Sequence, residues 1–490
     1  MIAYNILNSK IRDNIFIPKY YNPGLKQKIK RLSSVCDLIT ISKLATDNVI
    51  TISTGHEIGK MAYGTGDIPF IRTSDISNWE LKVLPKQGVS DEIYSEYADK
   101  QKIRAGDVLF VRDGTYLIGT NCLISELDEK ILFQSHILKI SFNKNDILDA
   151  YLFFAIINTD IFQEQVRSVQ FTADTIDTIG NRFLELVLPI PKDKEKVKRI
   201  SKKIKQYLDN RDKGKAFIKQ APLIIEEILE TNSVSPATSF LDKASGELLT
   251  ILNQETVSGE FSGFETFLIS SKDIQNRILL PKFYDPEIQK ELSTLRKKCN
   301  CVTIESLVSD KVLQITTGDE IGKMAYGTGN IPFVRTSDFS NWELKYDPKQ
   351  GVSSEIFDEY EKKQDVKAGD ILLVRDGTYL VGSSSMVSEK DGRLLYCGGL
   401  YKIRVLKKNI ISEWLLLALL NSYFVRKQMR NKQFTRDVID TLGKRFFEIV
   451  IPIPKDETLR DELSKIVKKV FNERISSREK IKEVVSQIYK

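Results

Sequence analysis

Residues 54–82 read TGHEIGKMAYGTGDIPFIRTSDISNWELK, and residues 317–345 read TGDEIGKMAYGTGNIPFVRTSDFSNWELK. The two stretches are identical at 25 of 29 positions and lie 263 residues apart. A period of that length far exceeds the roughly 20–50 residues of solenoid and propeller repeats. The chain therefore contains a tandem duplication of a whole domain.

The offset of 263 residues extends the duplication along the chain without any insertion. It aligns GDVLFVRDGTYLIG (106–119) with GDILLVRDGTYLVG (369–382), and FTADTIDTIGNRFLELVLPIPKD (171–193) with FTRDVIDTLGKRFFEIVIPIPKD (434–456). We therefore expect two copies of one unit, joined by a connector near 228–263. Two copies of one fold in one chain predict a pseudo-two-fold molecule that suits a partner of matching symmetry.

The composition is that of an ordinary folded protein of more than one domain, with 490 residues of which 41% are hydrophobic and 28% charged. The net charge of +7 suits a polyanionic partner without identifying one. Five cysteines do not make a disulfide scaffold, and nothing completes a zinc site beside Cys299 and Cys301. The N-terminus lacks a secretory signal, and the most apolar stretches are too short for a bilayer. We expect a cytoplasmic protein without membrane contact.

Each unit shows the patterns of a mixed α+β domain. Residues 68–72 and 107–112 are predicted strands, and Asp113–Gly114 is predicted to be the tight turn of a hairpin. Residues 146–167 are predicted to be helical and 185–190 to form a strand. The hairpin should carry Arg112, Thr115 and Tyr116 near its tip.

Each unit ends in a long amphipathic helix. Apolar residues follow three-and-four spacing after both copies of PIPKD, with Lys and Glu between them. Pro222 is expected to kink or restart the first helix. We predict that the two helices pack antiparallel, in the manner of a coiled coil, as a spacer; each could instead lie on its own domain.

No catalytic or cofactor-binding motif is apparent. The only histidines, His56 and His136, face Asp319 and Gly399 in the other copy, so a shared nucleophile–base pair is not expected. The segment GHEIGKM (55–61) lacks the spacing and the hydroxyl residue of a phosphate-binding loop. No methyltransferase tetrapeptide is present, so we expect no cofactor on this chain.

One set of residues leaves a nuclease open as an alternative. Asp75, Glu80 and Lys82 follow the acid…acid-x-Lys order of many magnesium nucleases, and Asp338, Glu343 and Lys345 repeat it. Because an acid and a lysine at alternating places are also common on exposed strands, a structural or DNA-contacting role is the other interpretation.

Basic and hydroxyl side chains in turn-like segments favour DNA binding, because such groups donate hydrogen bonds to phosphates and base edges. For an individual arginine the competing interpretation is an ion pair with a neighbour, Arg72 with Asp75 or Arg112 with Asp113. Residues 120–170 match 383–433 at only 14 of 51 positions, and within them Phe133-Gln134-Ser135-His136 faces Tyr396-Cys397-Gly398-Gly399. Either a solvent-exposed loop has drifted there, or the 133–136 loop, through Gln134 in particular, sets the base preference of one half-site. The candidate DNA-binding residues are Lys60, Arg72, Thr73, Ser74, Arg112, Thr115, Tyr116, Gln134, Lys323, Arg335, Thr336, Ser337, Arg375, Thr378 and Tyr379.

With the repeat, GDVLFVRDGTYLIG and the junction from LPIPKD into a helix, the chain resembles the specificity subunits of type I restriction-modification systems. IPFIRTSDI and GDILLVRDG look like segments of that family's target-recognition domains, and VLPIPKDKEKVKRI looks like the start of its spacer helix. The layout covers essentially the whole chain. One departure is that the family's two recognition domains usually differ widely, whereas these two are nearly the same over long stretches.

The resemblance implies a non-catalytic subunit that reads a bipartite, here near-symmetric, target in double-stranded DNA and holds two DNA methyltransferase subunits. Those subunits would carry S-adenosylmethionine, and motor-nuclease subunits could join them. It also implies a first target-recognition domain at 1–191, a helical spacer and connector at 192–263, a second recognition domain at 264–454 and a spacer helix at 455–490. Two further alternatives are a recognition protein that stands alone or serves another defence enzyme, and a purely structural adaptor.

Overall fold

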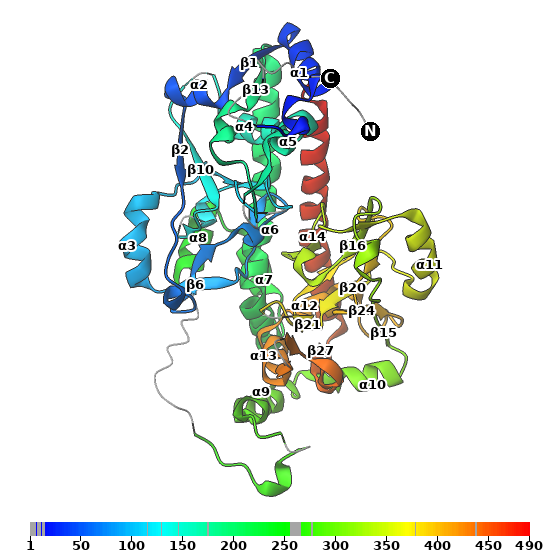
Figure 1. Ribbon diagram of the computed structural model, residues 1–490. Coiled ribbons are helices and arrows are strands. Elements are labelled where there is room, and N and C mark those ends of the chain that lie inside the picture. The colour runs from blue at the N-terminus through cyan, green and yellow to red at the C-terminus, as the bar shows by residue number, and fades with distance from the viewer. Residues whose placement is uncertain are drawn as a thin grey trace. The chain divides into compact units, whose positions relative to one another are not determined.

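The structure, a computed structural model, describes residues 6, 11, 15–114, 116–128, 130–145, 147–173, 176–254, 266–275, 278–377, 379–436 and 439–490. The chain divides into two units, the first made of residues 1–212 and 476–490 and the second of 213–475. The two divisions fall at equivalent points of the repeat, since 212 + 263 = 475. Each falls inside one of the two long helices, so each helix contributes to both units (Figure 1).

The first unit is built on small, mostly antiparallel sheets. A four-stranded sheet has the order β2-β10-β7-β8, and a three-stranded sheet has the order β6-β3-β9 with β3 and β9 parallel. The pairs β1–β13, β4–β5 and β11–β12 complete the unit. The strands are β1 Cys36–Thr40, β2 Ile50–Thr54, β3 Ile68–Ile71, β4 Ile76–Ser77, β5 Glu80–Leu81, β6 Gln87–Val89, β7 Val108–Val111, β8 Asn121–Leu123, β9 Leu132–Phe133, β10 Ile137–Phe142, β11 Phe171–Ala173, β12 Ile176–Thr178 and β13 Val187–Pro191.

The predicted strands of the first unit are present as β3, β7 and β13. The predicted hairpin is formed by β7 and β8, but its turn is not the expected Asp113–Gly114. The hairpin closes where Gly119 donates its N–H to Val111, and Asp113 instead bridges to Thr178. A two-residue turn signal was wrong here because a distant strand pairs with Asp113.

The helices of the first unit are α1 Pro23–Arg31, α2 Ile41–Thr46, α3 Asp91–Gln101, α4 Ala150–Ile157 and α5 Asp160–Val169. The single helix expected over 146–167 is two helices, α4 and α5. Asn158 ends α4, and the Thr159 side chain caps the start of α5 by accepting the N–H of Phe162. A threonine that offers its hydroxyl to the backbone favours a cap over a helix interior.

The second unit repeats this plan. Its sheets have the orders β15-β24-β20-β22, β19-β16-β23 and β21-β26-β25, with the pairs β14–β27 and β17–β18. The strands are β14 Cys299–Thr303, β15 Leu313–Thr317, β16 Ile331–Val334, β17 Phe339–Ser340, β18 Glu343–Leu344, β19 Gly351–Val352, β20 Ile371–Val374, β21 Asp376–Gly377, β22 Ser384–Met386, β23 Leu395–Tyr396, β24 Leu400–Val405, β25 Phe434–Arg436, β26 Ile439–Thr441 and β27 Val450–Pro454. The shorter helices are α7 Ser235–Asp242, α8 Ser245–Gln254, α9 Pro286–Leu295, α10 Ile304–Ser309, α11 Ser354–Gln364, α12 Glu413–Leu420 and α13 Tyr423–Lys432.

The two long helices are α6 Lys194–Thr231 and α14 Glu457–Gln487. In the first unit the apolar stripe at the start of α6 shares one core with the end of α14, and the Lys480 ammonium lies 5.5 Å from the centre of the Tyr207 ring. In the second unit Asn232, just after α6, donates to Asp456, just before α14. Within each unit the helix segments therefore run antiparallel, which confirms the predicted α+β class with packed long helices. Pro222 lies inside α6 without a break, so the expected restart is wrong.

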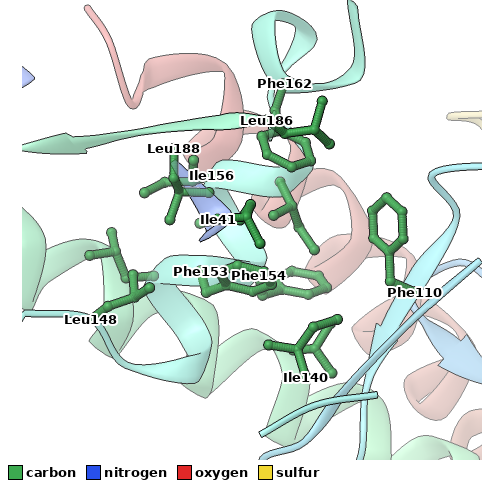
Figure 2. Close-up of a cluster of buried hydrophobic side chains, with 14 of the residues drawn as sticks. Ile41, Phe110, Ile140, Leu148, Phe153, Phe154, Ile156, Phe162, Leu186 and Leu188 are labelled. Atoms are coloured by element: carbon green, nitrogen blue, oxygen red, sulfur yellow. The ribbon is translucent and has the colours of Figure 1, made fainter. Parts of the chain in front are cut away.

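The main core of the first unit lies between the four-stranded sheet and α4 and α5 (Figure 2). Phe153, Phe154 and Ile156 from α4 share this core with Phe110 and Ile140 of the sheet, and all five side chains are fully buried. The sequence of α4 is apolar on all sides, unlike that of an amphipathic surface helix, because the helix is covered on all its faces.

Candidate nucleic-acid interface

The turn after β3 carries three of the expected DNA-binding residues. Arg72 and Thr73 are half-buried and Ser74 is exposed, and Asp75 closes the turn by accepting the N–H of Arg72 at 2.9 Å. The Asp75 carboxylate thus binds main-chain N–H groups, including that of Lys86 at 3.3 Å. The equivalents Arg335, Thr336 and Ser337 have the same exposure, and Asp338 accepts the N–H of Arg335 at 2.9 Å.

Lys60 and Lys323 lie in short exposed turns ahead of these strands, and both are exposed. In the first unit this segment lies along the 133–136 loop: the His56 N–H donates to the Phe133 carbonyl, and Ser135 donates to the Glu57 carboxylate. The segment that leads into the lysine turn therefore contacts the 133–136 loop within the unit.

Arg112 forms the ion pair that the sequence left open. Its Nε and Nη2 donate to Asp113 Oδ2 at 2.9 and 2.7 Å, and His136 Nδ1 lies 3.1 Å from the same oxygen. Burial alone would raise the pKa of Asp113, but the hydrogen bonds from Arg112, Thr178 and His136 hold it below its usual range. The Arg112 side chain remains 26% exposed beside this pair.

Arg375 makes the same fork to Asp376 in the second unit. Gly399 stands where the first unit has His136, and the guanidinium instead lies over the Tyr401 ring at 5.4 Å. Tyr401 is fixed by stacking on Phe446 and by donating to the Gly443 carbonyl at 3.0 Å. An identical arginine–aspartate pair thus has different neighbours in the two copies.

The remaining expected residues are placed unequally. Tyr116 is half-buried and Tyr379 exposed, whereas Thr115 and Thr378 lie outside the described residues. Gln134 is only 9% exposed, and its N–H donates to the Ile71 carbonyl where β9 meets β3. Its use as a base reader therefore requires the side chain to turn outward.

The proposed metal-binding triad lies in the interior. Asp75 is fully buried, Glu80 is 4% exposed and Lys82 8% exposed. Glu80 Oε1 lies 3.2 Å from Nη2 of Arg211 on α6, and burial raises the pKa of Asp75. No group of three or more His, Cys, Asp or Glu residues suited to a metal occurs in the described part of the chain. This geometry indicates a structural role for the acids.

Sequence reasoning missed the arginines that bind these acids. Arg474 of α14 lies 2.7 Å from Glu343, as Arg211 does beside Glu80, and both arginine side chains are 1% exposed. The signal was available, because Arg211 and Arg474 are related by the offset of 263. On a helix rich in lysine and glutamate, an arginine gives no local sign that it is buried.

Within the described residues no helix is long and apolar enough to cross a membrane. No family model and no curated protein matches the sequence. The fold is similar over 94% of this chain and 97% of the other to a type I restriction-modification S subunit from M. genitalium, at 12% identity and a TM-score of 0.35. It is also similar to the HsdS subunit from Thermoanaerobacter tengcongensis, over 94% of both chains at 14% identity and a TM-score of 0.27. A structure concerned with complex assembly and conformational transition of the type I restriction-modification system matches 93% of this chain and 96% of its own, at 14% identity and a TM-score of 0.27.

Proposed function

We propose that this chain is the non-catalytic DNA-recognition subunit of a type I restriction-modification complex, which reads a bipartite, near-symmetric target in double-stranded DNA. The observation that carries the proposal is the repeated surface: two copies of one α+β unit present the same Lys, Arg, Thr and Ser residues at equivalent turns. A duplex target with two similar half-sites is the partner that such a duplication fits.

The shared residues are assigned to the DNA backbone and the unlike ones to base preference. Lys60 and Lys323 are exposed, and Arg72 and Arg335 are half-buried. Cationic side chains at such places suit phosphate contacts. The 133–136 loop, which differs completely from its equivalent, is assigned to the bases of one half-site. The family resemblance of the sequence adds two methyltransferase subunits as partners, which bring S-adenosylmethionine and the chemistry, and motor-nuclease subunits where the complex also cuts DNA.

The first experiment measures the affinity of the purified chain for duplex DNA across a range of salt concentrations. The logarithm of the association constant should fall linearly with the logarithm of the salt concentration. Arg72→Ala with Arg335→Ala should weaken binding and flatten the slope. The control removes two positive charges from other exposed places, Lys43→Ala with Lys311→Ala, and should change little. Equal effects of the two pairs would contradict the assigned surface.

The second experiment adds the partner. Methyl transfer to DNA should appear only when a DNA methyltransferase subunit is combined with this chain. Salt-dependent DNA binding with no association with such a subunit would instead favour a recognition protein that stands alone or serves another enzyme. Absence of salt-dependent binding would favour a structural adaptor.

A further inference from the structure

The strand pair β4–β5 forms a hairpin with an unusual turn. Asn78 and Trp79 both have positive φ, at 52° and 65°, and Asn341 and Trp342 repeat this at 49° and 67°. Left-handed backbone is costly for a side chain as large as tryptophan, so surrounding contacts must stabilise the turn.

Those contacts place the hairpin in the interior. Trp79 is 5% exposed, its Nε1 donates to Asn158 at 2.9 Å, and its ring meets Phe154 edge-on. In the second unit the Trp342 ring meets Phe217 of α6 edge-on, with 6.2 Å between the ring centres. The turn is therefore used to insert a tryptophan into each unit.

The residue after each tryptophan joins the hairpin to a long helix. Glu80 binds Arg211 of α6 in the first unit, and Glu343 binds Arg474 of α14 in the second. All four side chains are at most 4% exposed. A buried ion pair is weak support for stability, because removing two charges from water offsets much of their attraction. What such a pair does provide is a specific geometry between two elements.

The other end of the hairpin holds the turn assigned to DNA. Lys82 donates its N–H to the Asp75 carbonyl at 2.9 Å, and the Asp75 carboxylate accepts the N–H of Arg72. In the second unit the Lys345 N–H donates to the Asp338 carbonyl at 2.8 Å, and the Asp338 carboxylate accepts the N–H of Arg335. A short series of hydrogen bonds and an ion pair thus connects Arg72 to α6 in the first unit, and an equivalent series connects Arg335 to α14 in the second.

We infer that Glu80 and Arg211 are positioning residues for DNA binding, which hold the Arg72 turn at a set place relative to α6, and that Glu343 and Arg474 hold the Arg335 turn relative to α14. The inference rests on the proposed function, because it takes Arg72 and Arg335 to contact DNA. The acid…acid-x-Lys pattern is then explained without a metal: Asp75 holds the Arg72 turn, and Glu80 joins the same hairpin to α6.

A double-mutant cycle on DNA affinity tests the coupling, with circular dichroism and thermal unfolding to establish that each variant is folded. Arg72→Ala should weaken binding about tenfold, the usual effect of losing a charged hydrogen bond. Glu80→Gln should have a similar effect by releasing the turn. The double variant should still bind only about tenfold more weakly than the unaltered protein. Once Glu80→Gln has released the turn, Arg72 no longer contributes to binding, and removing its side chain has no further effect.

The duplication supplies the matched control. Glu80→Gln combined with Arg335→Ala, in the other copy, should multiply to about a hundredfold loss. If Glu80→Gln does not fold, Arg211→Lys keeps a cation in the pair but with a different reach. Its loss of DNA affinity should be smaller, and it should again be non-additive with Arg72→Ala and multiply with Arg335→Ala. A purely stabilising pair would lower the unfolding temperature without distinguishing Arg72 from Arg335.

Multiplicative losses for Glu80→Gln and Arg72→Ala in folded protein would overturn the inference and leave the proposed function intact. No effect of Arg72→Ala and Arg335→Ala on DNA affinity would instead overturn the assignment of these arginines to DNA, and the inference with it.

Discussion

One ion pair between two helices is present in both copies, with its two charges exchanged. Lys28 of α1 pairs with Glu164 of α5 at 2.8 Å, and at the equivalent places Glu291 of α9 pairs with Lys427 of α13 at 3.0 Å. The charges have exchanged positions while the helices still meet. Because an exposed pair such as Lys28–Glu164 contributes little energy, avoiding two like charges is the better explanation of the exchange.

Gln134 and Arg72 should differ in what their loss does to DNA binding. Gln134→Ala should relax discrimination at one base pair, by about 1–3 kcal/mol if the contact is bidentate. Arg72→Ala should weaken binding to all sequences and reduce the salt dependence by roughly one phosphate. Selection of binding sites from a random duplex library, followed by affinity measurements on single-base variants, separates the two outcomes. If Gln134→Ala weakens every sequence equally, the loop does not read bases.

Glu226 of α6 should make the stability of the second unit depend on pH. Burial raises its pKa from 4.5 to about 7, with smaller contributions from Glu291 and Glu230, against the Phe424 N–H and Lys427. Because the folded state holds this proton more tightly than the unfolded state, stability should fall as the pH rises from about 4.5 through 7. Glu226→Gln should therefore raise the unfolding temperature at pH 8 and do so less at pH 5.5.

The expected difference in the gain between those pH values is about 2 kcal/mol, from linkage between pKa values near 4.5 and 7. Glu227→Gln is the control, because Glu227 is the exposed neighbour of Glu226 on α6 and is not among the charges that shift the pKa of Glu226. An equal gain for Glu226→Gln at both pH values would show that the carboxyl does not titrate in this range.

At the scale of the elements, the close approach of α6 and α14 in the second unit depends on Gly214. A Cβ at this residue would lie 2.6 and 2.7 Å from Cγ and Cδ of Arg474, whose guanidinium is held by Glu343. In an open helix Gly→Ala is favourable by about 1 kcal/mol. Here Gly214→Ala should destabilise the protein by about 1–3 kcal/mol, because the buried arginine has no free place to move. Ser477→Ala, at the equivalent place in α14, is the control in thermal unfolding and should have a smaller effect.

The helices should also act as the ruler between half-sites. Four residues inserted after position 212 and four after 475 lengthen both helices at equivalent points and keep the pairing inside each unit. At about 1.5 Å of helix rise per residue and 3.4 Å per base pair, the gap between recognised half-sites should grow by about two base pairs. An unchanged gap, measured by selecting targets with the lengthened protein, would show that the helices do not set the spacing.

At the scale of the whole molecule, the chain should bind DNA without altering it. Purified chain with magnesium and supercoiled plasmid should give neither nicks nor methylated bases. Asp75 and Glu80 are buried, and Glu80 is paired with Arg211, so these acids are not open to a metal ion, and the sequence contains no methyltransferase motif. Magnesium-dependent nicking that disappears with Glu80→Ala and Glu343→Ala together would contradict this. A folded variant that still nicks would point to a contaminating nuclease.

Much of the architecture followed from the amino-acid sequence alone. The offset of 263 residues predicts two α+β units, and apolar spacing predicts the two long helices that the structure contains. Such patterns can be read from the sequence because they are local: a helix stripe or a strand is recognised from neighbouring residues alone. The shared set around Arg72 could be found for the same reason, by comparing one copy with the other.

Only the tertiary structure decided what the charged residues do. Glu80 looks exposed in an alternating strand, and Arg211 looks exposed on a charged helix, yet each is buried against the other across 131 residues of sequence. Asp113 reads as a turn residue until Thr178 pairs with it. Whether a polar side chain contacts water, DNA or another charge depends on which distant segment folds over it, and neither composition nor periodicity contains that information.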